Sequence, residues 1–216
     1  MTKPIVFVID DDFSVREALE GLFASVGLAT EGYGSVLEFA AADRPDRPGC
    51  IVLDIRLPGQ SGLEFQEALA RAGTPRSVIL ISGHADVPMT VRAMRAGAVD
   101  VLTKPVRDQE LLEAVHRAIE QDLARRGEAN SRATVAARYE HLTRREREVM
   151  ALVVTGMPNK VIAVKVSITE ATVKIHRGQV MKKMGADSIA SLVRMSDLLG
   201  NGRPSCLGRR PDDTTT

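Results

Sequence analysis

The stretch that decides the fold is Ile51-Val52-Leu53-Asp54-Ile55-Arg56-Leu57-Pro58-Gly59. Its apolar run predicts a buried strand that ends at the carboxylate of Asp54, because a Pro-Gly turn signal follows soon after. Three other apolar runs also end at polar residues: 5–9 at Asp10, Asp11 and Asp12, 78–81 at Ser82, and 99–102 at Thr103-Lys104-Pro105. Helical patterns separate the runs, so we expect parallel strands whose carboxyl ends share one ligand-binding edge.

Residues 1–123 hold five such strand–helix units. Apolar residues at helical spacing follow the first strand at Val15, Leu19 and Leu22, and comparable patterns follow the later strands. This alternation predicts a doubly wound α/β domain built around a five-stranded parallel sheet.

Three acids, a hydroxyl and a lysine would meet at the edge of this sheet. Carboxylates gathered at one site repel each other and are normally neutralised by a hard cation with oxygen ligands, which favours Mg²⁺. A carboxylate can attack a phosphoryl group and form an aspartyl-phosphate. The lysine and the hydroxyl would then hold the new phosphoryl oxygens. The pattern therefore indicates magnesium-assisted phosphoryl transfer to an aspartate.

These residues resemble the receiver domain of two-component response regulators. The matching motifs are Asp10-Asp11, Asp54, Leu57-Pro58-Gly59-x-Ser61-Gly62, Ser82-Gly83, Ala96-Gly97-Ala98 and Lys104-Pro105. The resemblance implies a flavodoxin-like fold in which Asp54 is the phosphoacceptor, and Ser82 and Lys104 bind the phosphoryl group. It implies Mg²⁺ ligands at Asp10, Asp11, Asp54 and the backbone carbonyl of Arg56. It further implies no enzymatic activity beyond self-phosphorylation and autodephosphorylation at Asp54.

One position departs from the receiver pattern. Receivers commonly carry an aromatic residue three positions before the lysine, where this chain has Val101. Either Ser82 and the 86–96 helix carry the switch without that aromatic residue, or the coupling is weaker. His84, two residues after Ser82, either affects the access of water to Asp54 or is an ordinary surface histidine.

Charge divides the chain into two halves. Residues 1–123 carry 12 Lys and Arg against 19 Asp and Glu, a net −7, whereas residues 124–216 carry 17 against 9, a net +8. The split suggests a cation-binding front half and a back half that could approach a polyanion. No apolar run approaches the ~20 residues of a membrane span, and no signal peptide precedes the first strand. We therefore expect a cytoplasmic protein without disulfides, in which Cys50 is a core residue.

The back half contains helical patterns without strands. We expect a partly helical linker at 124–139, an all-α domain of four helices at 140–200, and a disordered tail at 201–216. Two of the predicted helices are short and joined by a tight turn, and the second is basic on its outer face, which describes a helix-turn-helix.

The second helix of this motif would enter the major groove of DNA. Lys174 could donate to guanine and Ile175 could touch a thymine methyl group. Gly178 either lets the backbone approach the DNA or reads no base. The residues predicted to contact DNA, through bases or phosphates, are Thr169, Thr172, Lys174, Ile175, Arg177, Gly178 and Lys182.

Residues 142–199 also resemble the LuxR/FixJ-type DNA-binding domain. The matching motifs are Leu142-Thr143-x-Arg145-Glu146-x-Glu148-Val149, Gly156-x-x-Asn159-Lys160-x-Ile162-Ala163, Thr172-Val173-Lys174-x-His176-Arg177 and Lys183-Met184-Gly185. Lys165-Val166-Ser167 replaces a more usual acidic-Leu-Gly turn. Together the two resemblances imply a FixJ/NarL-type response regulator. Its expected partners are a sensor histidine kinase, double-stranded promoter DNA and a second copy of the phosphorylated chain, with RNA polymerase as a further candidate.

Two rival interpretations remain open on the sequence alone. A small phosphohydrolase could use Asp54 as its nucleophile, but Arg56 stands where such an enzyme needs an acid. Alternatively, the front domain could be a phosphorylation-independent dimerisation module. The intact set of Asp10, Asp11, Asp54 and Lys104 argues against the second interpretation, whereas Val101 keeps it open.

Overall fold

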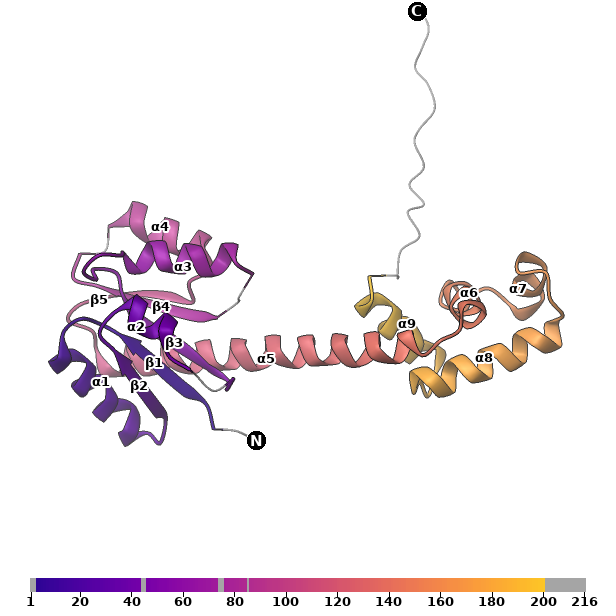
Figure 1. The fold of residues 1–216 in the computed structure, drawn as a ribbon, viewed down its shortest axis with the longest axis horizontal. Helices are drawn as coiled ribbons and strands as arrows, with labels where there is room; N and C mark the ends of the chain where they lie inside the picture. The colour runs from indigo at the N-terminus through magenta and orange to yellow at the C-terminus, as the bar shows by residue number, and fades with distance from the viewer. Residues whose placement is uncertain (1–2, 44–45, 74–75, 85, 201–216) are drawn as a thin grey trace, which may run out of the picture. The chain divides into compact units, whose positions relative to one another are not determined.

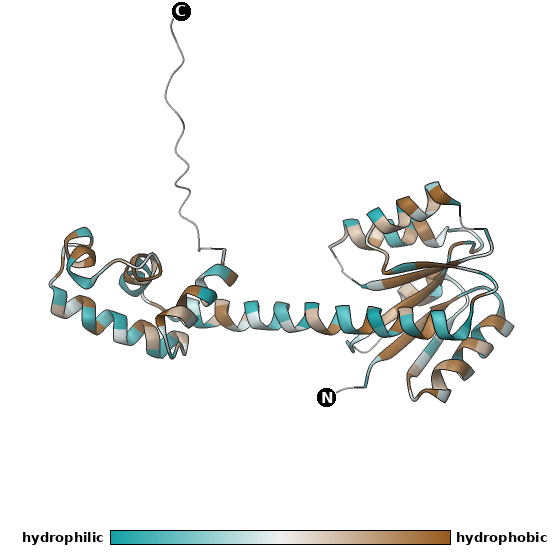
Figure 2. Ribbon diagram, turned by 180° about the vertical axis from the view of Figure 1, so that it is seen from behind, coloured by the Kyte–Doolittle hydropathy of each residue, from teal (hydrophilic) through white to brown (hydrophobic). Residues whose placement is uncertain are grey.

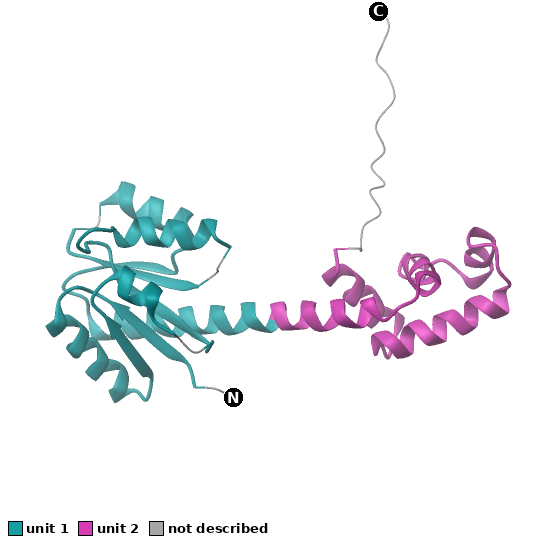
Figure 3. Ribbon diagram, viewed as in Figure 1, with its two compact units in different colours: residues 1–127 teal, residues 128–216 magenta. Residues whose placement is uncertain are grey.

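The computed structural model describes residues 3–43, 46–73, 76–84 and 86–200. The predicted disordered tail, 201–216, lies outside the described residues. The chain forms two compact units, Met1–Gly127 and Glu128–Thr216, which are coloured separately in Figure 3. Each unit has a hydrophobic core of its own, and each is described by itself below.

The first unit is built on a parallel sheet of five strands (Figure 1). The strands are β1 (Ile5–Ile9), β2 (Ala29–Tyr33), β3 (Gly49–Asp54), β4 (Ser77–Ser82) and β5 (Asp100–Thr103), and their order is β2-β1-β3-β4-β5. In β1, β3 and β4 every residue is buried, as expected of strands that are covered on both faces. The prediction of a doubly wound sheet is confirmed.

Five helices belong wholly or partly to the first unit. They are α1 (Phe13–Ser25), α2 (Val36–Ala41), α3 (Gly62–Arg71), α4 (Val87–Arg95) and the first part of α5 (Asp108–Glu140). Alternate strand residues form two cores: Phe7 and Leu53 pack with α2, α3 and α4, whereas Val8 and Val52 pack with α1 and α5. The hydrophobic strands between the helix layers are visible in Figure 2. Cys50 lies in the second core, and its burial raises the pKa of the thiol to about 12.

A buried carboxylate fixes α5 against the amino-terminal end of the sheet. Asp122 is 1% exposed and accepts a hydrogen bond from the backbone N–H of Gly49, at the start of β3, at 3.0 Å. It also forms ion pairs with Arg125 and Arg126 on its own helix. Arg126 also forms an ion pair with Asp46, with an N–O distance of 2.7 Å. Since a buried charge needs partners, this cluster restricts where α5 can leave the sheet.

The predicted linker, 124–139, is helical throughout and lies inside α5. The sequence indicated only partial helix because Gly127 disfavours helix by ~1 kcal/mol relative to Ala. The last part of α5 gains contacts within the second unit: Val135 is buried in its core, and Arg138 donates to the carbonyl of Met184 at 2.9 Å. Those contacts offset the cost of the glycine.

The second unit adds four helices to the end of α5. They are α6 (Arg144–Val153), α7 (Asn159–Lys165), α8 (Glu170–Met184) and α9 (Ile189–Leu198). Thr143 and Glu146 form a capping box at the start of α6, and Glu146 also pairs with Lys183 of α8 at 2.7 Å. Gly185 ends α8 in the left-handed conformation, at φ 66°. Among the described residues, no helix is both long and apolar enough to cross a membrane.

Candidate functional site

Three carboxylates meet at the carboxyl edge of the sheet. Asp10 follows β1, Asp54 ends β3, and Asp11 lies beside Asp10. One oxygen from each can be chosen so that all three lie within 4.8 Å of one another. Asp10 and Asp54 are 3% and 8% exposed, whereas Asp11 is exposed to solvent. The sequence placed these acids at neighbouring strand ends, and the structure brings them together.

Lys104 reaches the same carboxylates from the loop after β5. Its Nζ lies 2.7 Å from Asp10 Oδ2 and 2.5 Å from Asp54 Oδ2. Its backbone N–H donates to the carbonyl of Ser82 at 2.8 Å, and the Lys104–Pro105 peptide bond is cis. The lysine therefore neutralises two buried acids at once.

The charge states of this cluster depend on each other. Burial raises the pKa of the Asp10 carboxyl, and this effect outweighs the hydrogen bond from Lys104, which lowers that pKa. For Lys104, burial lowers the pKa, but the bonds to Asp10 and Asp54 outweigh the burial and raise it. The lysine thus stays charged beside an acid whose ionisation is disfavoured.

Ser82 and Arg56 complete the surroundings of Asp54. The Ser82 side chain is fully buried, and its Oγ accepts a hydrogen bond from the backbone N–H of His84 at 3.2 Å. The backbone N–H of Arg56 donates to Asp54 Oδ1 at 2.8 Å. The side chain of Arg56 reaches across to His84, with Nη2 2.6 Å from Nδ1. This last contact could not be predicted from the sequence, because Arg56 and His84 lie 28 positions apart and meet only in the folded chain.

A glycine allows the loop after β3 to close. A Cβ on Gly62 would lie 2.1 Å from the carbonyl oxygen of Asp54, and the Gly62 N–H donates to Ile55 at 3.0 Å. Only glycine permits this approach of α3 to the acidic site. The glycine of the Ser61-Gly62 pair in the receiver motif is therefore required for steric reasons.

The three acids fit a hard divalent cation. Their donor atoms are all carboxylate oxygens, the ligand type that Mg²⁺ and Ca²⁺ prefer, and Mg²⁺ needs only one or two protein carboxylates beside water. Since Lys104 shares both buried acids, a cation would compete with it for Asp54 and Asp10. The arrangement suits the binding of a cation together with a phosphoryl group.

The second candidate region is the outer face of α8. Val173, Val180 and Met184 of α8 are buried in the core of the second unit. Thr169 caps the helix by accepting from the backbone N–H of Thr172 at 3.1 Å, and Thr172 is half-buried. The predicted contact residues that are exposed are Thr169, Lys174, Ile175, Gly178 and Lys182.

Arg177 and Gly178 differ in their contacts within the second unit. Arg177 is half-buried, and its Nη1 donates to Asn159 Oδ1 of α7 at 2.8 Å, so this side chain links the two helices of the motif. A Cβ on Gly178 would meet nothing within 4 Å, so the fold itself does not require a glycine there.

Two family models match the chain. One, described as the response regulator receiver domain, matches residues 6–116, and the other, described as bacterial regulatory proteins of the luxR family, matches residues 140–196. Nodulation protein W of Bradyrhizobium diazoefficiens is 52% identical over 92% of this chain and 88% of its own length. The transcriptional regulatory protein FixJ of Rhizobium meliloti is 40% identical over 95% and 100%.

Solved structures agree with these matches. A low-resolution structure of the response regulator StyR is 41% identical, with a TM-score of 0.81 over 91% of this chain and 99% of StyR. The crystallised amino-terminal part of FixJ is 38% identical, with a TM-score of 0.51 over 56% of this chain and 96% of that fragment. The second match covers little more than half of this chain.

Proposed function

Because this chain belongs to the response regulators that join a receiver domain to a LuxR-type DNA-binding domain, we propose that its receiver is switched by phosphorylation of Asp54. The protein is a DNA-binding regulator of transcription, and its receiver implies a histidine kinase as partner. Both matches are to regulatory domains, which argues against the phosphohydrolase interpretation. The observation that carries the proposal is the convergence of Lys104 on Asp54 and Asp10.

The chemistry is a transfer to a carboxylate. An oxygen of Asp54 attacks the phosphorus of a phosphohistidine, the P–N bond breaks, the imidazole leaves with its electron pair, and an acyl phosphate forms. Mg²⁺, held by Asp10, Asp11, Asp54 and the Arg56 carbonyl, would neutralise charge on the phosphoryl oxygens. Lys104 must give up its bond to Asp54 and can then bind a phosphoryl oxygen. Hydrolysis of the acyl phosphate is the accompanying autodephosphorylation.

The hydroxyl of Ser82 links the site to α4. Bonding to a phosphoryl oxygen would draw Ser82 Oγ away from the N–H of His84, which lies three positions before the start of α4. We propose that the resulting change around α4 promotes a homodimer and allows α8 to bind promoter DNA. Dimers suit DNA half-sites about one helical turn apart. RNA polymerase is a further proposed partner. Because these partners act on or near promoter DNA, we propose that the protein works in the cytoplasm.

We propose that the chain has four parts. The receiver is 1–123, the linker is 124–139, the DNA-binding domain is 140–200, and the tail is 201–216. The family matches, at residues 6–116 and 140–196, lie inside the first and third of these ranges, and the compact units divide between Gly127 and Glu128.

The test is the mass of the protein in solution by light scattering, with Mg²⁺, before and after a small-molecule phosphodonor is added. Asp54→Asn is run alongside. Wild type should shift from monomer to dimer, and the variant should neither gain phosphate nor shift. Phosphate incorporation by the variant would refute Asp54 as the acceptor. Incorporation by wild type without a change in mass would refute dimerisation as the switch.

A further inference from the structure

Helix α4 is held to the receiver by few apolar contacts. Ala93 is its only buried residue, whereas Val87, Val91 and Met94 are 76%, 43% and 48% exposed. Close packing normally fixes a helix on a sheet, because each buried apolar side chain adds dispersion and hydrophobic contacts. A helix with so little buried surface needs other contacts to define its position.

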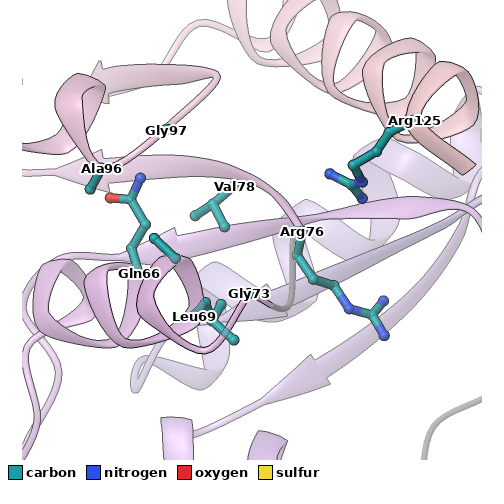
Figure 4. A pocket seen from close by; sticks show the side chains of 9 residues that line it. Gln66, Leu69, Gly73, Arg76, Val78, Ala96, Gly97 and Arg125 are labelled. Carbon is teal, nitrogen blue, oxygen red and sulfur yellow. The ribbon is translucent and has the colours of Figure 1, made fainter. Parts of the chain in front are cut away.

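Two cavities adjoin α3, and one of them also adjoins α4. One, shown in Figure 4, has a volume of about 290 Å³ and is lined by residues that include Gln66, Leu69, Val78, Ala96 and Gly97. The other is an open groove of about 510 Å³ lined by Glu67, Ala70, Val91 and Arg92 among others. The outer side of the contact between the two helices is therefore an open groove and not a packed interface.

Two polar contacts cross this interface. Inside it, Gln66 is 2% exposed and donates through Nε2 to the carbonyl of Ala93 at 3.1 Å. Outside it, Arg92 and Glu67 form a two-point ion pair, with N–O distances of 2.6 and 2.8 Å. A two-point ion pair fixes orientation as well as distance. The two contacts join adjacent residues of α3 to adjacent residues of α4.

At the acidic site, Lys104 and Ser82 both have partners within the receiver. Lys104 Nζ is bonded to Asp54 Oδ2, the carboxylate that a phosphoryl group would occupy, and Ser82 Oγ is bonded to the N–H of His84. The polar contacts between α3 and α4 thus occur together with the Lys104–Asp54 bond, which a phosphoryl group on Asp54 would replace. A contact present in one state and weakened in the other shifts the balance between them.

We propose that Gln66 and Glu67 are positioning residues that hold α4 in its unphosphorylated place and so set the phosphorylation level at which the protein switches. This inference rests on the proposed function, since it assigns a threshold to that same switch. On this proposal both contacts are lost when α4 moves, so breaking either one destabilises only the unphosphorylated place of α4. The switched state is then reached at a lower concentration of phosphodonor.

The variants can be chosen so that the fold survives. Gln66→Met keeps the side-chain volume, and the carbonyl of Ala93 retains a hydrogen bond from the N–H of Ala98 at 3.1 Å. The Oε1 of Gln66 has no hydrogen-bond partner among the described residues, so its removal leaves no donor without an acceptor there. Glu67→Arg breaks the ion pair, and the added change Arg92→Glu restores it with reversed charges.

A matched control is available at the start of α5. Arg107 and Glu110 form an ion pair at 3.2 Å within the receiver, and both side chains are more than half exposed. Arg107→Gln removes a pair of the same chemical type without touching α3 or α4. Its switching threshold should equal that of wild type.

The experiment titrates each full-length variant with acetyl phosphate and Mg²⁺. Phosphate on Asp54 is measured by intact mass, and the dimer fraction by light scattering. Gln66→Met and Glu67→Arg should each lower the half-maximal donor concentration about threefold, and together about tenfold, and the charge-swapped pair should return it toward wild type.

Each outcome decides between the two proposals. Unchanged or raised thresholds in both variants, with wild type responding normally, would overturn the positioning role and leave the proposed function standing. A wild type that incorporates no phosphate would overturn both. Failure of the charge swap to restore the threshold would show that Glu67 does not act through Arg92.

Discussion

Lys104 Nζ lies 2.5 Å from Asp54 Oδ2, so the side chain proposed to hold the phosphoryl group already occupies the acceptor carboxylate. Because it bonds Asp10 as well, a divalent cation must displace a lysine whose pKa is raised by these two partners against the effect of burial. The lysine and the cation therefore compete for the same oxygens.

The first prediction concerns this competition. Lys104→Met should bind Mg²⁺ about tenfold more tightly than wild type, since losing one close positive charge leaves two acids unneutralised. Isothermal titration calorimetry measures the affinity, and Arg107→Gln serves as the control for loss of a remote charge. Equal Mg²⁺ affinity in Lys104→Met and wild type would show that Lys104 does not compete with the cation for these carboxylates.

A second prediction follows from the contact between Arg56 and His84. The two residues come from the loops after β3 and β4, and their side chains bridge those loops beside Asp54 and Ser82. Without the bridge, water should reach an acyl phosphate on Asp54 more readily. Arg56→Ala and His84→Ala should each shorten the phosphoryl lifetime about threefold, and the double variant should lose no more than either single one.

The lifetime is measured by following radiolabelled phosphate on protein that has been separated from its donor. Additive losses in the double variant would mean that the two side chains act separately, and a longer lifetime in either single variant would contradict the shielding role.

The sheet and the acidic site could be predicted because they depend on local patterns. Apolar runs such as 51–53 end at chemically distinctive residues, and the parallel topology brings those ends to one edge. The contacts of Arg56 with His84 and of Glu67 with Arg92 could not be predicted, because they depend on which way long side chains turn after folding. The same holds for Asp122, whose acidic side chain gave no sign of burial beneath two arginines.

The helical linker shows a different limit. Gly127 weakens the helix locally, but Asp122 fixes the chain before it and Val135 is buried after it. Propensity predicted partial helix, and tertiary contacts on either side override it.

A third prediction concerns the turn between α7 and α8. Ser167 has a φ of 52°, the one non-glycine residue with positive φ among those that the structure describes. An L side chain in this conformation costs roughly 1–2 kcal/mol, so Ser167→Gly should stabilise the second unit by about 1 kcal/mol after the extra entropy of an unfolded glycine is deducted. Urea unfolding followed by circular dichroism measures the change. Ser167→Ala keeps the side-chain strain and should bring no such gain; a comparable gain from alanine would exclude strain as the cause.

The last prediction tests how α8 reads DNA. Lys174 and Lys182 are both exposed on this helix, but Lys174 lies near its amino-terminal end, where recognition helices reach base edges, and Lys182 lies in its last turn. A lysine on a guanine edge discriminates among sequences, whereas a lysine on a phosphate adds affinity for every sequence. The two variants should therefore differ in kind.

Duplexes selected in vitro for binding and random duplexes of equal length provide the comparison, measured by fluorescence anisotropy at several salt concentrations with phosphorylated protein. Lys174→Ala should lose about tenfold in affinity for the selected duplex and much less for the random one, because a base contact contributes about 1–3 kcal/mol of discrimination. Lys182→Ala should weaken both equally and reduce the salt dependence by about one released counterion. An equal loss on both duplexes in Lys174→Ala would instead make Lys174 a phosphate contact, and selectivity would then have to come from its exposed neighbour Ile175 or from the shape of the DNA.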